Sequence, residues 1–172
     1  RNPLQPLSGT LARCVLYITT VPVTTGTSPT QEVHPMTQTL EPPAAESVGD
    51  AQQRIDAWLA KFNEALASRD VERVTALFAT SSFWRDLVAF TWNIKTVEGH
   101  EEIADMLRAR LDDVDPVGFA TADPASDDGD GIVSAFITFQ LAVGRGEGHL
   151  RIRPDDDGVD KGWTLLTTLQ EL

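Results

Sequence analysis

The chain has 172 residues, of which 41% are hydrophobic and 23% charged, a composition that suits one soluble domain with a sizeable core. Its formal net charge of -12 repels phosphate backbones and anionic lipid, so we expect neither nucleic acid nor a membrane as a partner. Cys14 is the one cysteine, which excludes an internal disulfide and a cysteine metal site and indicates a reducing, cytoplasmic setting.

Residues 1–49 are rich in proline, threonine and serine. This composition prevents regular periodicity and predicts a disordered or loosely attached tail. Met36 opens the stretch "MTQTLEPPAAESVGD", which resembles a natural N-terminus, so we expect residues 1–35 to be non-native. The folded domain is predicted at residues 50–172.

Two helices are predicted at the start of this domain. Asp50 and Gln53 have the spacing of a capping box, and apolar residues follow at helical spacing to about Ser68. Asp70 has the character of an N-cap and predicts a second, shorter helix that includes Val71, Val74, Leu77 and Phe78.

The rest of the domain predicts strands interrupted by one helix. Residues 83–97 are rich in aromatic and β-branched types and predict one or two strands. Gly99 opens a third helix with acidic residues in its first turn, and Pro116 closes it. Four further strands are predicted at 117–122, 131–142, 147–153 and 162–170. This order predicts an α+β fold, with three helices packed on one face of a curved, mostly antiparallel sheet.

The order of elements, with "FWRD" on the strand pair between the second and third helices, resembles the NTF2-like superfamily and its SnoaL-like branch. The resemblance covers residues 50–172 and implies a cone-shaped sheet whose open end can hold a small molecule. The stretches "FWRDLVAFTWNIKTVEGHEEI", "GRGEGHLRIRP" and "GWTLLTTLQEL" further resemble the NTF2-like module that precedes the FAD and NAD(P)H-binding domains of bacterial and fungal flavin-dependent monooxygenases.

The narrower resemblance implies an accessory domain of an oxidoreductase that is not catalytic by itself. It would dock onto a flavin domain, form a homodimer or shape substrate access. FAD and NAD(P)H are implied only for the parent protein, because no G-x-G-x-x-G lies between a strand and a helix here. The alternatives are a stand-alone SnoaL-like cyclase, isomerase or dehydratase, and a non-catalytic domain that binds a small apolar or aromatic ligand.

Asp86 is the candidate general base of the enzymatic alternative. Strand alternation places it on one face with Trp84 and away from Arg85, and burial among aromatic rings would raise the pKa of its carboxyl group. An isomerase also needs a hydrogen-bond donor for the developing oxyanion. The one tyrosine, Tyr17, lies in the tail, which leaves His149 or a tryptophan N–H for that role. The other interpretation of Asp86 is a structural hydrogen bond or ion pair.

Large aromatic residues could wall a ligand cavity or simply fill the core. The candidates for such a pocket are Trp58, Trp84, Phe90, Trp92 and Trp163.

The predicted strand 147–153 has one polar, basic face. His149, Arg151 and Arg153 alternate with apolar residues there, and Gln140 of the preceding strand extends this surface. The surface is either a solvated sheet face or an interface with a second subunit or a flavin domain.

Two further motifs have simple explanations. His100 stands next to Glu101 and Glu102 on one helix, where adjacent side chains point apart, so we expect helix capping and no metal. The stretch "GRGEGH", residues 144–149, is followed by a strand and not by a helix, which predicts a glycine-rich hairpin and not a phosphate loop.

Overall fold

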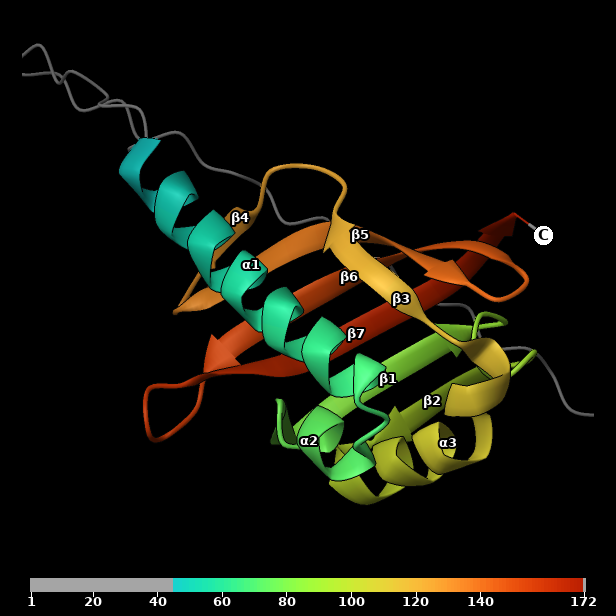
Figure 1. Ribbon diagram of the computed structural model, residues 1–172. Coiled ribbons are helices and arrows are strands. Elements are labelled where there is room, and N and C mark those ends of the chain that lie inside the picture. Colours follow the sequence, from blue (N-terminus) through green and yellow to red (C-terminus); the bar gives the residue numbers. More distant parts are fainter. Residues whose placement is uncertain (1–44, 172) are drawn as a thin grey trace, which may run out of the picture. The chain divides into compact units, whose positions relative to one another are not determined.

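The computed structural model describes residues 45–171, and the predictions made for residues 1–44 lie outside this part of the chain. Residues 45–171 form an α+β fold of three helices and one sheet, whose arrangement is drawn in Figure 1. The helices are α1 (Ala45–Ala67), α2 (Val71–Thr75) and α3 (Gly99–Val114). The strands are β1 (Phe78–Leu87), β2 (Ile94–Glu98), β3 (Val117–Thr121), β4 (Ser126–Gly129), β5 (Ile132–Leu141), β6 (Gly144–Pro154) and β7 (Asp160–Glu171).

The seven strands form one sheet in the order β2-β1-β7-β6-β5-β3, and β4 pairs with β5 beside β3. Each pairing is antiparallel except that of β1 with β7, which is parallel. The predicted mostly antiparallel sheet is therefore confirmed, and β5, β6 and β7 form its closing meander (Figure 1).

The helices lie near their predicted positions. Helix α1 begins at Ala45, earlier than the predicted start, so Asp50 lies within the helix and is not its N-cap. Asp70 is the N-cap of α2 and accepts a 3.0 Å hydrogen bond from the backbone N–H of Arg73. Helix α3 ends at Val114, as predicted.

The strand ends differ from the sequence-based prediction in three places. Strand β1 begins at Phe78 and not at residue 83, and β4 lies in a stretch that was predicted to be a turn. Strand β6 begins at Gly144, so "GRGEGH" belongs to the strand and the turn before it is Ala142–Val143. Gly146 and Gly148 are required by packing, because a Cβ atom at Gly146 would lie 2.3 Å from the ring of Phe139 and one at Gly148 would lie 2.1 Å from the carbonyl oxygen of Leu166.

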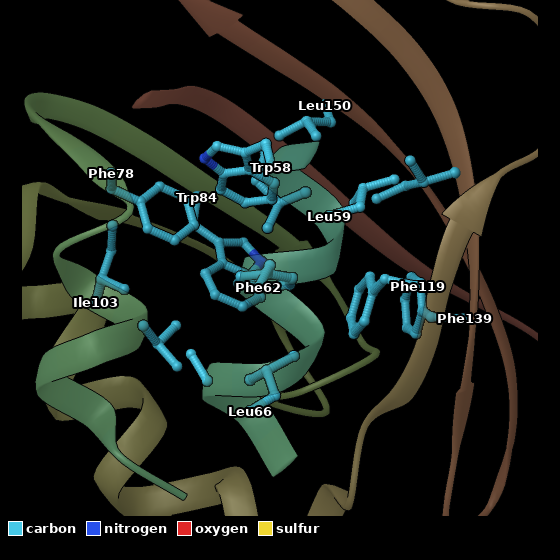
Figure 2. Close-up of a cluster of buried hydrophobic side chains, with 14 of the residues drawn as sticks. Trp58, Leu59, Phe62, Leu66, Phe78, Trp84, Ile103, Phe119, Phe139 and Leu150 are labelled. Carbon is cyan, nitrogen blue, oxygen red and sulfur yellow. The ribbon is translucent and has the colours of Figure 1, made fainter. Parts of the chain in front are cut away.

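The inner face of the sheet, toward the helices, carries a cluster of buried aromatic rings (Figure 2). Trp58 stacks on Phe62 with centroids 4.8 Å apart, and Phe119 stacks on Phe139 at 4.6 Å. Since the rings contact one another, side chains fill the space between α1 and the curved sheet.

An ion pair ties α1 to the end of the sheet. The guanidinium of Arg54 donates two hydrogen bonds to the carboxylate of Asp160, at 2.9 and 2.6 Å, and one to the carbonyl of Gly131 at 2.8 Å. The side chains of this ion pair are only 22% and 24% exposed, so water screens it less than a surface pair. None of the helices within residues 45–171 has the length and apolar character needed to cross a membrane.

Candidate functional site

Asp86 lies on the inner face of β1, where its side chain is 0% exposed. Its Oδ2 atom accepts hydrogen bonds from the backbone N–H and the hydroxyl of Thr91, at 2.8 and 2.7 Å. Its Oδ1 atom accepts one from the hydroxyl of Thr167 at 2.8 Å, and the backbone N–H of Phe90 lies 3.1 Å from both oxygens. These four donors match the roughly four acceptor sites of a carboxylate.

The hydrogen bonds to Asp86 hold the turn that follows β1. Val88 and Trp92 in this turn have φ angles of 59° and 54°, a left-handed conformation that is costly for bulky side chains. The carboxylate binds the backbone between these two residues and offsets that cost. The geometry therefore gives Asp86 a structural task at the end of β1.

The candidate oxyanion donors occupy different places relative to Asp86. His149 lies on the opposite, outer face of the sheet, so the structure does not bring it to the carboxylate. The indole N–H of Trp84 donates to the hydroxyl of Thr167 at 3.0 Å, and that hydroxyl donates to Asp86. A tryptophan N–H is therefore connected to Asp86, but through a threonine that was not among the predicted site residues.

The five candidate pocket residues separate into two groups. Trp58, Trp84 and Phe90 are buried in the aromatic cluster, at 2%, 0% and 0% exposure. Trp92 is 52% exposed on the turn after β1, and Trp163 lies on the outer face of β7. The structure therefore does not gather the five around one cavity.

The outer face of the sheet turns away from the helices and carries an unusual number of apolar side chains. Strand alternation gives this face Phe83 and Arg85 on β1, and Phe136 on β5. Phe83 is 38% exposed and Phe136 is 59% exposed. A solvated sheet face normally presents polar side chains at such positions, so this composition makes the outer face a candidate interaction surface.

A row of paired residues crosses the centre of the outer face. From β2 to β5 it consists of Thr96, Arg85, Leu166, His149 and Phe136. The rings of Phe136 and His149 lie 4.8 Å apart. A groove of about 550 Å³ follows this row, and it is also lined by Phe83, Thr164 and Leu165.

The basic strand lies on the outer face, as its alternation predicted. Arg151 and Arg153 lie over the ring of Trp163, at 5.0 and 5.1 Å from its centroid. Arg151 also pairs with Asp128 at 3.2 Å, and Arg153 donates to the hydroxyl of Ser81 at 3.2 Å. Both arginines are thus held by neighbours in the same chain.

Arg85 differs from the other arginines of the described residues. Each of the others makes a hydrogen bond or an ion pair with this chain, whereas Arg85 makes none within residues 45–171. Glu147, on the outer face of β6, likewise has no such partner in this part of the chain. Gln140 lies on the same face of β5, beside Arg145.

The environment of His149 keeps its imidazole neutral near pH 7. Burial lowers the pKa of His149 below its ordinary value of 6.5, the carboxylate of Asp128 opposes this, and the guanidinium of Arg151 adds to it. A neutral imidazole in the groove can donate one hydrogen bond and accept another.

His100 has a structural contact. Its Nε2 atom lies 2.8 Å from the carbonyl oxygen of Phe78, which joins the start of α3 to the start of β1. Within residues 45–171 no group of three or more histidine, cysteine and acidic side chains is placed to hold a metal ion.

Sequence reasoning missed the residues that make the outer face apolar and the threonine that binds Asp86. The alternation in "WTLLTTL" places Thr167 on the same face as Leu165, which was a usable signal for a buried hydroxyl. In the stretch "SAFITF", Phe136 shares its phase with Ser134 and Thr138, opposite Ala135, Ile137 and Phe139. The alternation was therefore a usable signal that Phe136 points outward.

No protein-family model and no curated protein matches the sequence. A ketosteroid isomerase-like protein from Erwinia carotovora atroseptica has a TM-score of 0.59 at 9% identity, over 72% of this chain and 98% of that one. An NTF2-like protein with a cystatin-like fold from Novosphingobium aromaticivorans has a TM-score of 0.52 at 16% identity, over 72% of this chain and 84% of that one. The chain has the NTF2-like fold.

A third solved structure agrees with this assignment of the NTF2-like fold. A proposed dehydratase of the NTF2-like family from Streptomyces avermitilis has a TM-score of 0.55 at 15% identity, over 72% of this chain and 99% of that one. At such identities the likeness shows the fold alone, and the isomerase and dehydratase names stay with those proteins. Nothing in these comparisons links the NTF2-like domain to a flavin monooxygenase, which remains a prediction from sequence.

Proposed function

We propose that this NTF2-like domain is a non-catalytic docking module, which binds another folded protein surface through the outer face of its sheet. The main observation behind the proposal is the groove across that face. It is lined by the exposed Phe83 and Phe136 and by Arg85, which has no hydrogen-bond or ion-pair partner within residues 45–171. Exposed aromatic residues and arginine are enriched at protein interfaces.

The state of Asp86 supports a module without chemistry of its own. A general base must reach the proton that it removes, and this carboxylate is fully buried and bound by donors from its own chain. Trp84 and Phe90 are also fully buried, and their ring centroids lie 4.9 Å apart. The stand-alone cyclase, isomerase or dehydratase therefore has weaker support than docking.

The resemblance to the flavin monooxygenase module is compatible with this docking role, but the proposal does not depend on it. A flavin domain and a second copy of the chain are both folded surfaces that could cover the groove. FAD and NAD(P)H stay implied for a parent protein only, and no residue of the groove is assigned to either cofactor.

Hydroxyl-radical footprinting tests docking even when the partner has not been identified. The protein is oxidised in its native assembly and again after dilution has dissociated the assembly, and the oxidation of single residues is compared. Phe136 is expected to be protected several-fold in the assembly, because the partner covers it. Trp92 is the matched control, since it is similarly exposed but does not line the groove. Equal oxidation of Phe136 in both states would contradict docking through this face.

A further inference from the structure

The groove on the outer face has an apolar lining that holds one charge. Apart from the neutral His149, its lining side chains are apolar or carry a hydroxyl group, and Arg85 is the charged one among them. Within residues 45–171 no carboxylate lines the groove, although the chain has 26 acidic residues against 14 basic ones. The groove thus combines an apolar lining with a single cation, in a chain whose overall charge is negative.

The guanidinium of Arg85 favours a carboxylate as its partner. The side chain is exposed and makes no hydrogen bond or ion pair within residues 45–171. A planar guanidinium can bind a carboxylate through two parallel hydrogen bonds, so one arginine is a complete partner for that group. A phosphate group is typically held by backbone N–H groups at a helix N-terminus, whereas the residues that line this groove all belong to strands.

The strand pairing sets the distance between this cation and the aromatic end of the groove. Arg85 on β1 and His149 on β6 are both paired with Leu166 on β7, which lies between them. Neighbouring strands are about 4.8 Å apart, so the backbones of Arg85 and His149 lie about 10 Å apart. Phe136 is paired with His149, and their ring centroids are 4.8 Å apart. A ligand with its carboxylate at Arg85 has room for an apolar body over Leu166 and for a ring beside Phe136.

The volume of the groove and the charge of the chain favour a small molecule over an acidic protein segment. The groove has a volume of about 550 Å³, and small-molecule sites typically have about 300–1,000 Å³. The formal net charge of -12 repels an acidic protein surface, whereas a small monocarboxylate brings only one negative charge. On the inner side of the sheet the aromatic cluster fills the space below α1, so the groove is the better place for such a ligand.

We infer that the groove of the outer face is a binding site for a small arylalkanoic acid, whose carboxylate binds Arg85 and whose ring lies beside Phe136 and His149. The inference goes beyond the docking function and does not rest on it, although both use the same face. A ligand in the groove occupies part of the surface that a protein partner covers, so the two compete.

A pair of probes that differ only in charge tests this site. 4-Phenylbutyrate has a short alkyl chain between its carboxylate and its ring, and 4-phenylbutyramide is its uncharged counterpart. Their dissociation constants are measured by ligand-observed NMR titration of the full chain, at a protein concentration at which the assembly has dissociated. The carboxylate is expected to bind at least about tenfold more tightly than the amide, because charge-assisted hydrogen bonds are stronger than neutral ones.

Three variants locate the binding site. Arg85→Gln changes an exposed side chain and is expected to weaken the carboxylate at least about tenfold, with the amide within about twofold of its wild-type affinity. Arg145→Gln is the matched control, because Arg145 is also an exposed arginine but pairs with Glu171 and does not line the groove. It is expected to keep the preference for the carboxylate. Phe136→Ser removes a ring from the groove and is expected to weaken both probes several-fold.

The outcomes separate this inference from the docking proposal. Equal affinity of the two probes for the wild-type chain, no binding of either at millimolar concentration, or a preference that survives in Arg85→Gln would overturn the ligand site. Loss of the preference in Arg145→Gln as well would also overturn it, since overall charge would then determine the affinity. Footprinting of dialysed protein, which has lost small ligands, tests docking separately. Protection of Phe136 without probe binding leaves docking and removes the ligand site, and probe binding without protection does the reverse.

Discussion

The hydroxyl of Thr167 donates a 2.8 Å hydrogen bond to the carboxylate of Asp86, although the two residues are 81 positions apart in the chain. The bond joins β7 to the end of β1 and lies in the buried interior. Asp86 in turn holds the backbone of Phe90 and Thr91. One carboxylate thus fixes the strand end, the following turn and a neighbouring strand.

Replacement of Asp86 is expected to reduce stability strongly. Asp86→Ala leaves the N–H groups of Phe90 and Thr91 and the hydroxyl of Thr167 without an acceptor, at about 1–3 kcal/mol for each group that stays buried. We expect urea unfolding to show a loss of about 3–5 kcal/mol. Asp112→Ala, a change at an exposed carboxylate, is the control, with an expected change within about 0.5 kcal/mol. Equal stability of the two variants would refute the structural task of Asp86.

The glycines of β6 provide a second test. Gly146→Ala forces a methyl group against the ring of Phe139, and we expect a loss of about 1–3 kcal/mol in the free energy of unfolding. Gly49→Ala in helix α1 meets nothing within 4 Å and should instead stabilise the domain by about 0.5–1 kcal/mol. Thermal unfolding of both variants measures these changes. If Gly146→Ala leaves the free energy of unfolding unchanged, Phe139 must be able to move aside at no cost, which would contradict the prediction.

The pair of Arg54 and Asp160 is expected to be coupled. A double-mutant cycle with Arg54→Met and Asp160→Asn should give about 1–2 kcal/mol, because two short hydrogen bonds join partly buried groups. The more exposed pair of Arg108 and Glu72 should show no measurable coupling in the same measurement. Similar coupling energies in both cycles would show that burial does not determine the strength of these ion pairs.

His149 makes stability depend on pH in one direction. Because its pKa is lowered in the folded state, the unfolded chain binds more protons as the pH falls below about 6.5. The contribution of a neutral His149 is complete above that value and is lost as the pH falls toward the folded pKa. Urea unfolding at several pH values should show a steeper decline for the wild-type chain than for His149→Gln, and parallel curves would contradict the shift.

Much of the fold was predictable because it depends on local patterns. Asp70 was identified as an N-cap, and the alternation of His149, Arg151 and Arg153 placed them on one face. The early start of β1 was not predictable, because "FATSS" lacks clear alternation and its first residues had already been assigned to the second helix.

The candidate site was less predictable, because it depends on pairing between distant strands. No pattern near Asp86 reveals Thr167, which arrives through the parallel pairing of β1 with β7. The placement of Trp163 against two arginines likewise depends on the register of β6 with β7. The groove of the outer face exists only once five strands are in order.

Sedimentation velocity of two variants of the native assembly tests the docking account most directly. Phe136→Ser removes an aromatic ring from the outer face, and Trp92→Ser removes one of similar exposure from the turn after β1. The account predicts that Phe136→Ser shifts the protein to a slower-sedimenting species, while Trp92→Ser sediments as the wild-type protein does. Unchanged sedimentation of Phe136→Ser, or an equal shift in both variants, would contradict it.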